Sequence, residues 1–378
     1  MSKARELAEL GAVYDSGALS NRNIVINGAM QVAQRGTSST GLGATSGYYT
    51  VDRINPNFNS TAGRLTMTQE SITDLPGFNK CVKFACTTAD TSIGAAEYFL
   101  CTMQAIEGQN LQQLAKGTSS AKKVTVSFYV KGNAAATYVC ELQDQNSREI
   151  SKSFSVTTDW TRVVLTFDGD TSGTITNTNT LGMGINFWLH AGSNFNSGSA
   201  GDLNTSWDNT SNNKRAAGID SFFDSTSRTF FVTGLQMEVG DTATDFEHRT
   251  FGDELQRCSR YYQKTKAASD TTKHFGLVFI GADAGGVSYG TLAVPLVTTM
   301  RTVPSLETTG TVSNYALWVK NTNTALSTFS VDTGIDDGTI NGQFYLNAYA
   351  SVSAGAGSCG AVRANNASGA FVALDAEL

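Results

Sequence analysis

The sequence predicts a mainly β protein, made of an N-terminal jelly-roll sandwich, a short helical connector and a smaller C-terminal β-sandwich. Three observations lead to this fold class. Charged residues make up only 16% of the 378 residues, below the roughly 25% that is typical of globular proteins. Apolar residues recur at every second position in many short runs, as half-buried strands require. Gly, Ser, Thr and Asn fill the segments between these runs, and these residues favour turns.

The first 20 residues are predicted to be an attachment segment. One or two helical turns are expected over residues 2–10, because Leu7 and Leu10 lie three positions apart and Gly11 is a stop signal. Such a helix is too short to be stable alone in water. It therefore either binds a partner, through Leu7 and Leu10, or is a frayed terminus.

Residues 21–248 are predicted to form the jelly roll. The clearest strand runs from Lys123 to Val130, where every second residue from Val124 onwards is apolar. After the Gly132-Asn133 turn, the segment Thr137–Leu142 is expected to return as the partner strand of a hairpin. Further strands are expected over Arg162–Phe167 and Gly184–His190.

A long polar stretch, Ala191–Asp220, contains Trp207 in its middle. A segment of this length without apolar periodicity is either disordered or a surface loop with a task. Trp207 is followed by Asp208 and Asn209. An aromatic face packs against sugar C–H groups, while carboxylates and amides bind hydroxyls. We therefore name these three residues, together with Trp188, as candidate glycan contacts. The alternative for Trp207 is packing at a core edge or a subunit seam, and the alternative for Trp188 is a position in the core or in a groove.

The end of the jelly roll changes from strand to helix. Phe231, Leu235 and the alternate residues between and after them predict one face of a strand that ends at Gly240. Phe251, Leu255, Cys258 and Tyr262 then follow at spacings of four, three and four, which is one stripe of a helix. A helical connector is expected over residues 249–265. Phe251, Leu255 and Tyr262 are predicted to contact other chains.

Residues 266–378 are predicted to form the second sandwich. A strand is expected to start at Leu277, and others are expected over Tyr289–Leu296, Tyr315–Val319, Phe344–Ala350 and Phe371–Leu374. Ala354–Ser358 is expected to be a turn or loose loop. Because Ala and Val outnumber large side chains here, the core is expected to be thin, which favours stabilisation by self-association.

Composition and charge also limit the classes of partner that are expected. The net charge of −6 is spread along the chain without a basic patch, so nucleic acid is not an expected partner. No apolar stretch approaches the ~20 residues of a membrane span, and the N-terminus lacks the apolar region of a secretion signal. We therefore expect no membrane insertion and folding in a cytoplasm. The six cysteines form no CxxC pair and are interpreted as buried, reduced thiols.

No catalytic residue, metal ligand or cofactor is assigned from the sequence. His190 and His248 invite a catalytic interpretation, but no GxSxG or other nucleophile motif accompanies them. A glycosidase-type pair of carboxylates stays open, because any two acids can converge in space. Asp168, Asp170 and Asp220 could bind a structural calcium ion, although loop aspartates more often form turns.

Four segments carry a family resemblance. The first is Asn23–Met30 with Gln34-Arg35-Gly36, and the second is Tyr49–Arg53, where Ile54 replaces the tryptophan of the usual DRW element. The third joins Leu235–Gly240 to Phe246–Tyr262, and the fourth is Leu374–Leu378. Together, and in this order, they resemble a family of bacteriophage tail-fibre and virion-appendage proteins. Lys123–Gly132 and Trp160–Phe167 resemble the jelly roll of carbohydrate-binding modules.

The resemblance implies a non-enzymatic, homotrimeric structural protein, located in the virion and assembled in the host cytoplasm. A tail-fibre subunit is implied first, which binds a host-surface receptor, a glycan or a protein, and which joins other tail or virion proteins through its N-terminus. Two alternatives stay open. One is a capsid-decorating or connecting protein with an assembly role, and the other is a polysaccharide-degrading enzyme.

Overall fold

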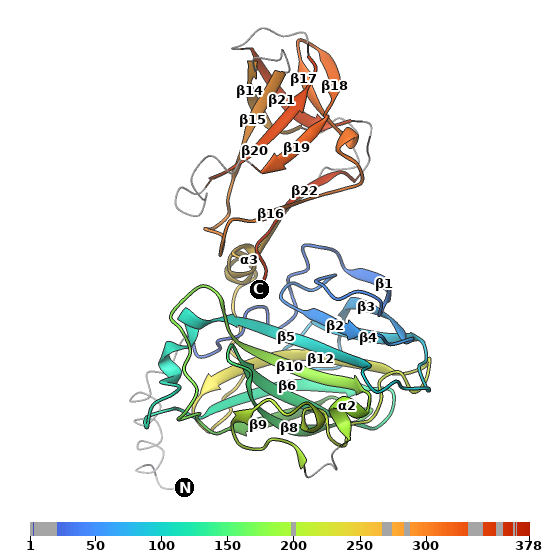
Figure 1. Cartoon of the computed structure of the whole chain (residues 1–378), viewed down its shortest axis with the longest axis vertical. Coiled ribbons are helices and arrows are strands. Elements are labelled where there is room, and N and C mark those ends of the chain that lie inside the picture. Colours follow the sequence, from blue (N-terminus) through green and yellow to red (C-terminus); the bar gives the residue numbers. More distant parts are fainter. Residues whose placement is uncertain are drawn as a thin grey trace. The chain divides into compact units, whose positions relative to one another are not determined.

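The computed structural model describes residue 3 and residues 21–197, 202–266, 274–282, 288–331, 343–352, 358–365, 367 and 369–378. The chain divides into two compact units, Met1–Glu254 with Leu378 and Leu255–Glu377. Both are built from antiparallel sheets, so the chain is mainly β as predicted (Figure 1). None of the described helices is long and apolar enough to cross a membrane. Leu7 and Leu10 lie outside the described residues, and the predicted domain limits at residues 20, 248 and 265 stay predictions.

Unit 1 is a sandwich of two six-stranded antiparallel sheets between which the chain crosses repeatedly, as in a jelly roll. Sheet A has the order β1 (Ser38–Leu42), β3 (Arg64–Ser71), β4 (Lys80–Thr88), β12 (Thr229–Val239), β6 (Val124–Gly132) and β9 (Thr161–Phe167). Sheet B has the order β11 (Asp208–Asn209), β8 (Arg148–Val156), β7 (Ala136–Asp144), β10 (Leu181–Ala191), β5 (Tyr98–Glu107) and β2 (Asn55–Asn59). A 3₁₀ helix, η1 (Gly108–Leu114), follows β5.

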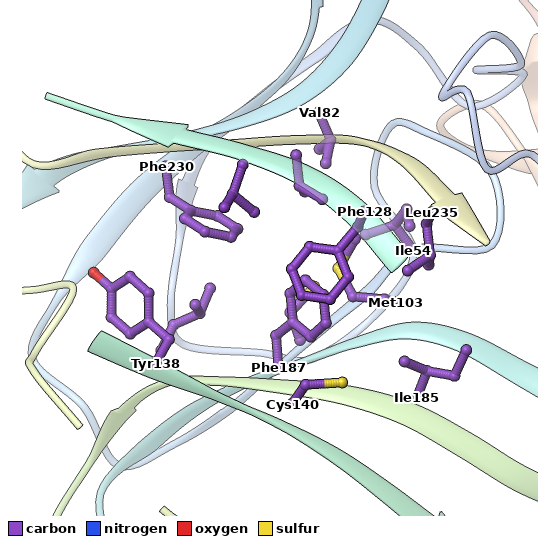
Figure 2. Close-up of a cluster of buried hydrophobic side chains, with 14 of the residues drawn as sticks. Ile54, Val82, Met103, Phe128, Tyr138, Cys140, Ile185, Phe187, Phe230 and Leu235 are labelled. Carbon is purple, nitrogen blue, oxygen red and sulfur yellow. The ribbon is translucent and has the colours of Figure 1, made fainter. Parts of the chain in front are cut away.

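The core of unit 1 lies between these sheets. Figure 2 shows Phe128 and Phe230 of sheet A together with Tyr138 and Phe187 of sheet B inside the sandwich. The rings of Phe128 and Phe187 are 4.7 Å apart, and all four side chains are at most 1% exposed. Burying one such side chain stabilises the fold by roughly 1.5–3 kcal/mol. The packed interior therefore holds the outer face of each sheet in place.

β12 departs from the predicted alternation. The prediction placed Phe231 on the same face as Leu235, but Leu235 is in the core and Phe231 is half-buried on the opposite face. Gly234 adopts a φ of +63°, and the register against β6 shifts between Thr233 and Gln236. Such a bulge moves the side chains that follow it to the other face of the sheet. The prediction therefore assigned Phe231, which precedes the bulge, to the wrong face.

The predicted hairpin between Lys123–Val130 and Thr137–Leu142 is also wrong. The two strands exist as β6 and β7, but β6 pairs with β9 and β12 in sheet A. β7 pairs with β8 and β10 in sheet B. The link after Gly132 therefore crosses from one sheet to the other. Alternation identifies a strand and its buried face, but it does not identify the neighbouring strand.

The helix after the jelly roll is shorter than predicted. α3 covers Phe251–Ser259, and Thr250 caps it, because its Oγ1 accepts from the amide of Asp253 at 3.2 Å and donates to that carboxylate at 2.8 Å. Tyr262 does not extend the helical stripe. It begins β13 (Tyr262–Lys266), whose backbone pairs with a strand of unit 2.

Unit 2 contains two antiparallel sheets. The smaller has the order β13, β22 (Phe371–Asp375) and β16 (Ser305–Thr308). The larger has the order β18 (Thr322–Ala325), β17 (Tyr315–Val319), β21 (Cys359–Ala364), β14 (His274–Ala282), β15 (Ser288–Pro295), β20 (Gln343–Ala350) and β19 (Thr328–Val331). A 3₁₀ turn, η4 (Val312–Asn314), precedes β17. The core includes Ala348, Ala350 and Ala364 beside larger side chains such as Tyr315 and Leu346, and the predicted thin core stays a prediction. Residues 354–357 of the predicted loop lie outside the described residues.

All six cysteines are free thiols, and five of them are buried as predicted. Burial raises the pKa of the Cys81 thiol to about 12 and that of Cys86 to about 11. Cys359, at the start of β21, is exposed, so the prediction of a buried thiol is wrong there. The buried cysteines are therefore small apolar core residues.

Candidate functional site

The outer face of sheet B carries a polar strip, which consists of Asn57, Thr102, Asn186 and Glu141. These residues come from β2, β5, β10 and β7. The antiparallel register places Thr102 opposite Asn186, and Asn186 opposite Glu141. Because opposite residues of paired strands point to the same face, four segments that are distant in sequence bring their side chains into one row.

The members of the polar strip are joined by hydrogen bonds. Asn57 Nδ2 donates to Thr102 Oγ1 at 3.2 Å, and Thr102 Oγ1 donates to Asn186 Oδ1 at 2.9 Å. Asn186 Nδ2 then donates to Glu141 Oε1 at 3.1 Å. Each bond fixes the direction of the next, because a hydroxyl or an amide that donates on one side accepts on the other. The strip is therefore an ordered set of donors and acceptors.

A hollow of about 280 Å³ lies at this strip. Its lining mixes polar and apolar side chains, among them Asn55, Asn57, Tyr98, Leu100, Thr102, Gln143 and Asn186. The ring of Tyr98 is held edge-on by those of Phe195 and Trp188, at 5.3 and 5.8 Å. Asn55 Oδ1 is buried and has no hydrogen-bond partner among the described residues. A ligand donor would satisfy this oxygen, whose unpaired burial costs about 1–3 kcal/mol.

The polar stretch after β10 folds over the rest of this face. Its described part contains α2 (Ser193–Asn196), β11 and the 3₁₀ turn η3 (Asn212–Lys214). Phe195 and Ala216 pack with Trp188 in a small apolar cluster. Trp188 is 1% exposed, and its Nε1 donates to Glu141 Oε2 at 3.1 Å. The loop therefore covers Trp188, and an external ligand does not reach this predicted glycan contact in the structure.

Arg215 fastens this loop to the sheet. Its Nε and Nη2 each donate to Glu141 at 2.7 Å, and its Nε lies 3.2 Å from Glu149 Oε2. Burial, together with the neighbouring Glu141 charge, raises the pKa of Glu149 to about 8. Although burial opposes it, hydrogen bonding to Arg215 holds the pKa of Glu141 below its ordinary value. Both carboxylates are 0% exposed, so this pair is closed to a substrate.

Trp207, Asp208 and Asn209 lie at the other edge of sheet B from β2. Trp207 is half-buried against the core, and its Nε1 donates to the carbonyl of Asp168 at 2.7 Å. Lys116 Nζ lies 4.4 Å from the centre of its ring. Asp208 and Asn209 are exposed in β11, which pairs with β8. These residues do not line the hollow, and their assignment to glycan binding stays a prediction.

The aspartates considered for calcium do not form one site. Despite partial burial, hydrogen bonds from Arg148 and Lys116 hold the pKa of Asp170 well below its usual range. Lys116 Nζ lies 2.7 Å from Asp170. Asp168 pairs with a lysine at 3.1 Å, and Asp220 accepts from a backbone amide at 2.7 Å. Protein cations and donors therefore satisfy them separately.

The residues predicted to contact other chains differ in exposure. Phe251 is 55% exposed, and Leu255 is half-buried. Tyr262 is 0% exposed, and its hydroxyl donates to Glu307 Oε2 at 3.0 Å within unit 2. Tyr262 therefore stabilises its own sheet and does not offer a surface to a second chain. Phe251 keeps an apolar surface that another chain could cover.

The sequence prediction missed the hollow. Its signal was present in Asn55, Asn57 and Asn59, which alternate with Pro56 and Phe58. This pattern indicates a strand with one polar face. The contact of this polar face with Tyr98 and Thr102 of β5 depends on the pairing of the two strands, which the sequence pattern does not specify.

Comparisons with known proteins give only weak similarities. No protein-family model matches the chain, and no curated protein matches it either. A family 30 carbohydrate-binding module aligns with 62% of this chain and 94% of its own, at 10% identity and a TM-score of 0.30. A family 11 module from Clostridium thermocellum, in complex with a β-1,3-1,4-mixed-linked tetrasaccharide, covers 56% of this chain and 98% of its own, at 12% identity and 0.25.

A phage protein is also similar at this level. The enzymatically active domain of tailspike protein 4 from bacteriophage CBA120 aligns with 58% of this chain, at 10% identity and a TM-score of 0.29. The alignment spans 21% of that phage chain. Scores this low do not decide the function of the present chain.

Proposed function

We propose that the chain is a non-enzymatic subunit of a bacteriophage tail fibre that binds a host-surface glycan at the hollow on sheet B. One observation carries the binding part of this proposal. The hollow combines the ordered polar strip with the ring of Tyr98. A sugar requires this combination, because its hydroxyls need matched donors and acceptors while its C–H face packs on an aromatic surface.

The resemblance of the four sequence segments supports the proposal that the chain belongs to a phage particle. This proposal includes a homotrimer, residence in the virion and attachment to other tail or virion proteins through the N-terminal segment. The hollow is slightly smaller than the roughly 300–1,000 Å³ of most ligand pockets, so a single site is expected to bind weakly. Three copies per fibre and several fibres per particle would convert weak binding into firm attachment.

The closed state of the Glu141–Glu149 pair favours binding over hydrolysis. A glycosidase needs two carboxylates that flank the scissile bond. This pair is buried and bonded to Arg215. A host protein as receptor, and a role in capsid decoration, remain the alternatives that a different outcome of the tests would favour.

The test is a glycan array with the full chain, followed by titration of the best glycan. We expect binding without release of product. Asn57→Ala and Thr102→Val should each weaken binding at least tenfold, because each removes a member of the polar strip. Asn209→Ala is the matched control, since Asn209 is an exposed amide at the opposite edge of the sheet.

The opposite pattern, with loss of binding only in Asn209→Ala, would move the site to Trp207. Absence of binding to every glycan would overturn the proposal, and release of shortened saccharides would make the chain an enzyme. The position of the chain in a reconstructed particle separates a tail fibre from a capsid-decorating protein.

A further inference from the structure

A second group of polar side chains meets in unit 1. Asp90 lies after β4, Glu97 directly precedes β5, and His190 is near the end of β10. One donor atom from each of the three residues lies within 4.8 Å of the others. None of these residues belongs to the polar strip or lines the hollow.

His190 is oriented toward this group. It is 0% exposed, and its Nδ1 lies 2.8 Å from Ser221 Oγ. The ring of Phe223 meets the imidazole edge-on at 5.3 Å. When Nδ1 donates to Ser221, Nε2 carries the lone pair and faces Glu97 Oε2 at 3.8 Å. This arrangement, in which one ring nitrogen is fixed by an oxygen, is typical of imidazoles that bind metal ions.

Two atoms in the group lack partners. His190 Nε2 and Glu97 Oε2 are both buried without a hydrogen bond to any described residue. Their 3.8 Å separation is too long for a direct hydrogen bond. Buried polar atoms are nearly always paired, and each exception requires an explanation. A cation between them would provide a partner for both.

The carboxylates of Asp90 and Glu97 are also arranged to bind a cation. Asp90 is 4% exposed, and its Oδ2 accepts from Thr61 Oγ1 and from the amide of Ala62, both at 2.8 Å. No salt bridge joins Asp90 or Glu97 to a lysine or arginine of the described chain. An imidazole binds a metal ion in its neutral form, through the ring nitrogen that carries the lone pair.

We infer that Asp90, Glu97 and His190 bind one divalent transition-metal ion, for which zinc is the probe. Imidazole nitrogen with carboxylate oxygens suits zinc and its neighbours, whereas calcium prefers oxygen ligands alone. Tetrahedral zinc–ligand bonds of about 2.0–2.2 Å place the donors about 3.3–3.6 Å apart, so the side chains must close in from separations of up to 4.8 Å on binding. The side chain of Glu97 is 15% exposed and provides the entry path.

Such an ion would connect two separate segments. It would tie the link between β4 and β5 to the end of β10, and it would fix Glu97, the residue before Tyr98 of the hollow. The ion is assigned from the geometry of the three side chains alone. It does not depend on whether the hollow binds a glycan.

The test is titration of the untagged full chain with zinc chloride after treatment with a chelator. We expect one zinc per chain and a higher melting temperature. Glu97→Gln should weaken zinc binding at least about 100-fold, since a lost ligand costs no less than a lost neighbour of a ligand. Glu70→Gln is the control, because Glu70 is a carboxylate of sheet A that pairs with Lys83 at 3.7 Å, and it should bind zinc as the unchanged chain does.

Ser221→Ala is a second, independent variant. It leaves all three ligands in place but removes the oxygen that orients His190, and it should weaken binding by about 10–100-fold. Circular dichroism without zinc checks that each variant is folded. The inference is wrong if the unchanged chain takes up no zinc. It is also wrong if Glu97→Gln and Ser221→Ala both bind zinc as tightly as the unchanged chain does.

Discussion

The backbone amide of Asn27 donates to Glu254 Oε2 at 2.6 Å, across 227 residues of sequence. Arg249 Nη1 donates to the other oxygen of this carboxylate at 3.1 Å, and Glu247 Oε2 accepts from the amide of Asn23 at 2.7 Å. The beginning and the end of unit 1 are therefore fastened together. The same residues belong to the first and third segments of the family resemblance, so these two segments contact each other in the structure. We call this set of hydrogen bonds the clasp.

Arg249→Ala is expected to destabilise unit 1 by about 3–5 kcal/mol. The Arg249 and Glu254 side chains are only 7% and 9% exposed, and removal of one partner leaves the other charge buried and unpaired. Urea unfolding measures the difference. Lys131→Ala serves as the control, because its pair with Asp74 is more exposed and should change stability by about 1 kcal/mol or less. Equal effects of both variants would contradict the clasp.

The stability of unit 1 is expected to fall as the pH rises from about 6.5 to about 8. Glu149 has a folded pKa of about 8 against an ordinary value of 4.5, so the folded chain keeps a proton that the unfolded chain releases. This contribution is fully present below pH 4.5 and is lost as the pH rises through 8. Glu141, whose pKa is lowered, has the opposite effect below its ordinary value. His190, whose pKa burial lowers from 6.5 to about 4, has the opposite effect up to about pH 6.5.

Glu149→Gln should flatten this pH dependence, because the amide can donate toward Glu141 without titrating. The free energy of unfolding, measured by urea at several pH values, checks this. An unchanged slope in Glu149→Gln would show that another group titrates in this range.

The proposed homotrimer is expected to depend on Phe251. Phe251 is 55% exposed, and Val164 on β9 is 47% exposed, so the two are matched apolar surface residues. Light scattering of the eluting chain should give three times the chain mass. Phe251→Ser should lower this mass and Val164→Ser should not. A monomeric unchanged chain at micromolar concentration would refute the trimer.

Gly28→Ala is expected to destabilise unit 1 clearly, by roughly 1–3 kcal/mol. A Cβ at Gly28 would lie 2.1 Å from the carbonyl oxygen of Leu235, so the backbone must shift. Gly252→Ala, in the first turn of α3, meets only Thr250 Oγ1 at 3.9 Å and should be neutral or stabilising by up to about 1 kcal/mol. Thermal unfolding of both variants compares them directly.

The strands that follow a simple pattern were predicted correctly from the sequence. β6, β9, β17 and β22 match the expected segments closely, because each alternates or forms a short apolar run. A helix over residues 249–265 was predicted, and α3 begins close to that start, at Phe251, but its end at Ser259 was not predicted, since strand pairing of Tyr262 decided it. Local sequence determines what a segment tends to form, while distant partners determine where it stops.

The sites could not be predicted in the same way. Asn57 and Thr102 are 45 positions apart, and their contact follows from the pairing of β2 with β5. His190 was noticed in the sequence, but its neighbours Asp90 and Glu97 come from another part of the chain. No periodicity links such residues, because their distance depends on the register of several strands at once.

Arg215 is one of several residues that fasten the loop over sheet B, and it binds a carboxylate that also ends the polar strip. Such an arrangement allows the β-sandwich to be kept while the loop on its surface changes. Related chains could exchange the rest of this covering segment, and with it the shape offered to a receptor, while retaining the residues that fasten it and leaving the aromatic interior unaltered.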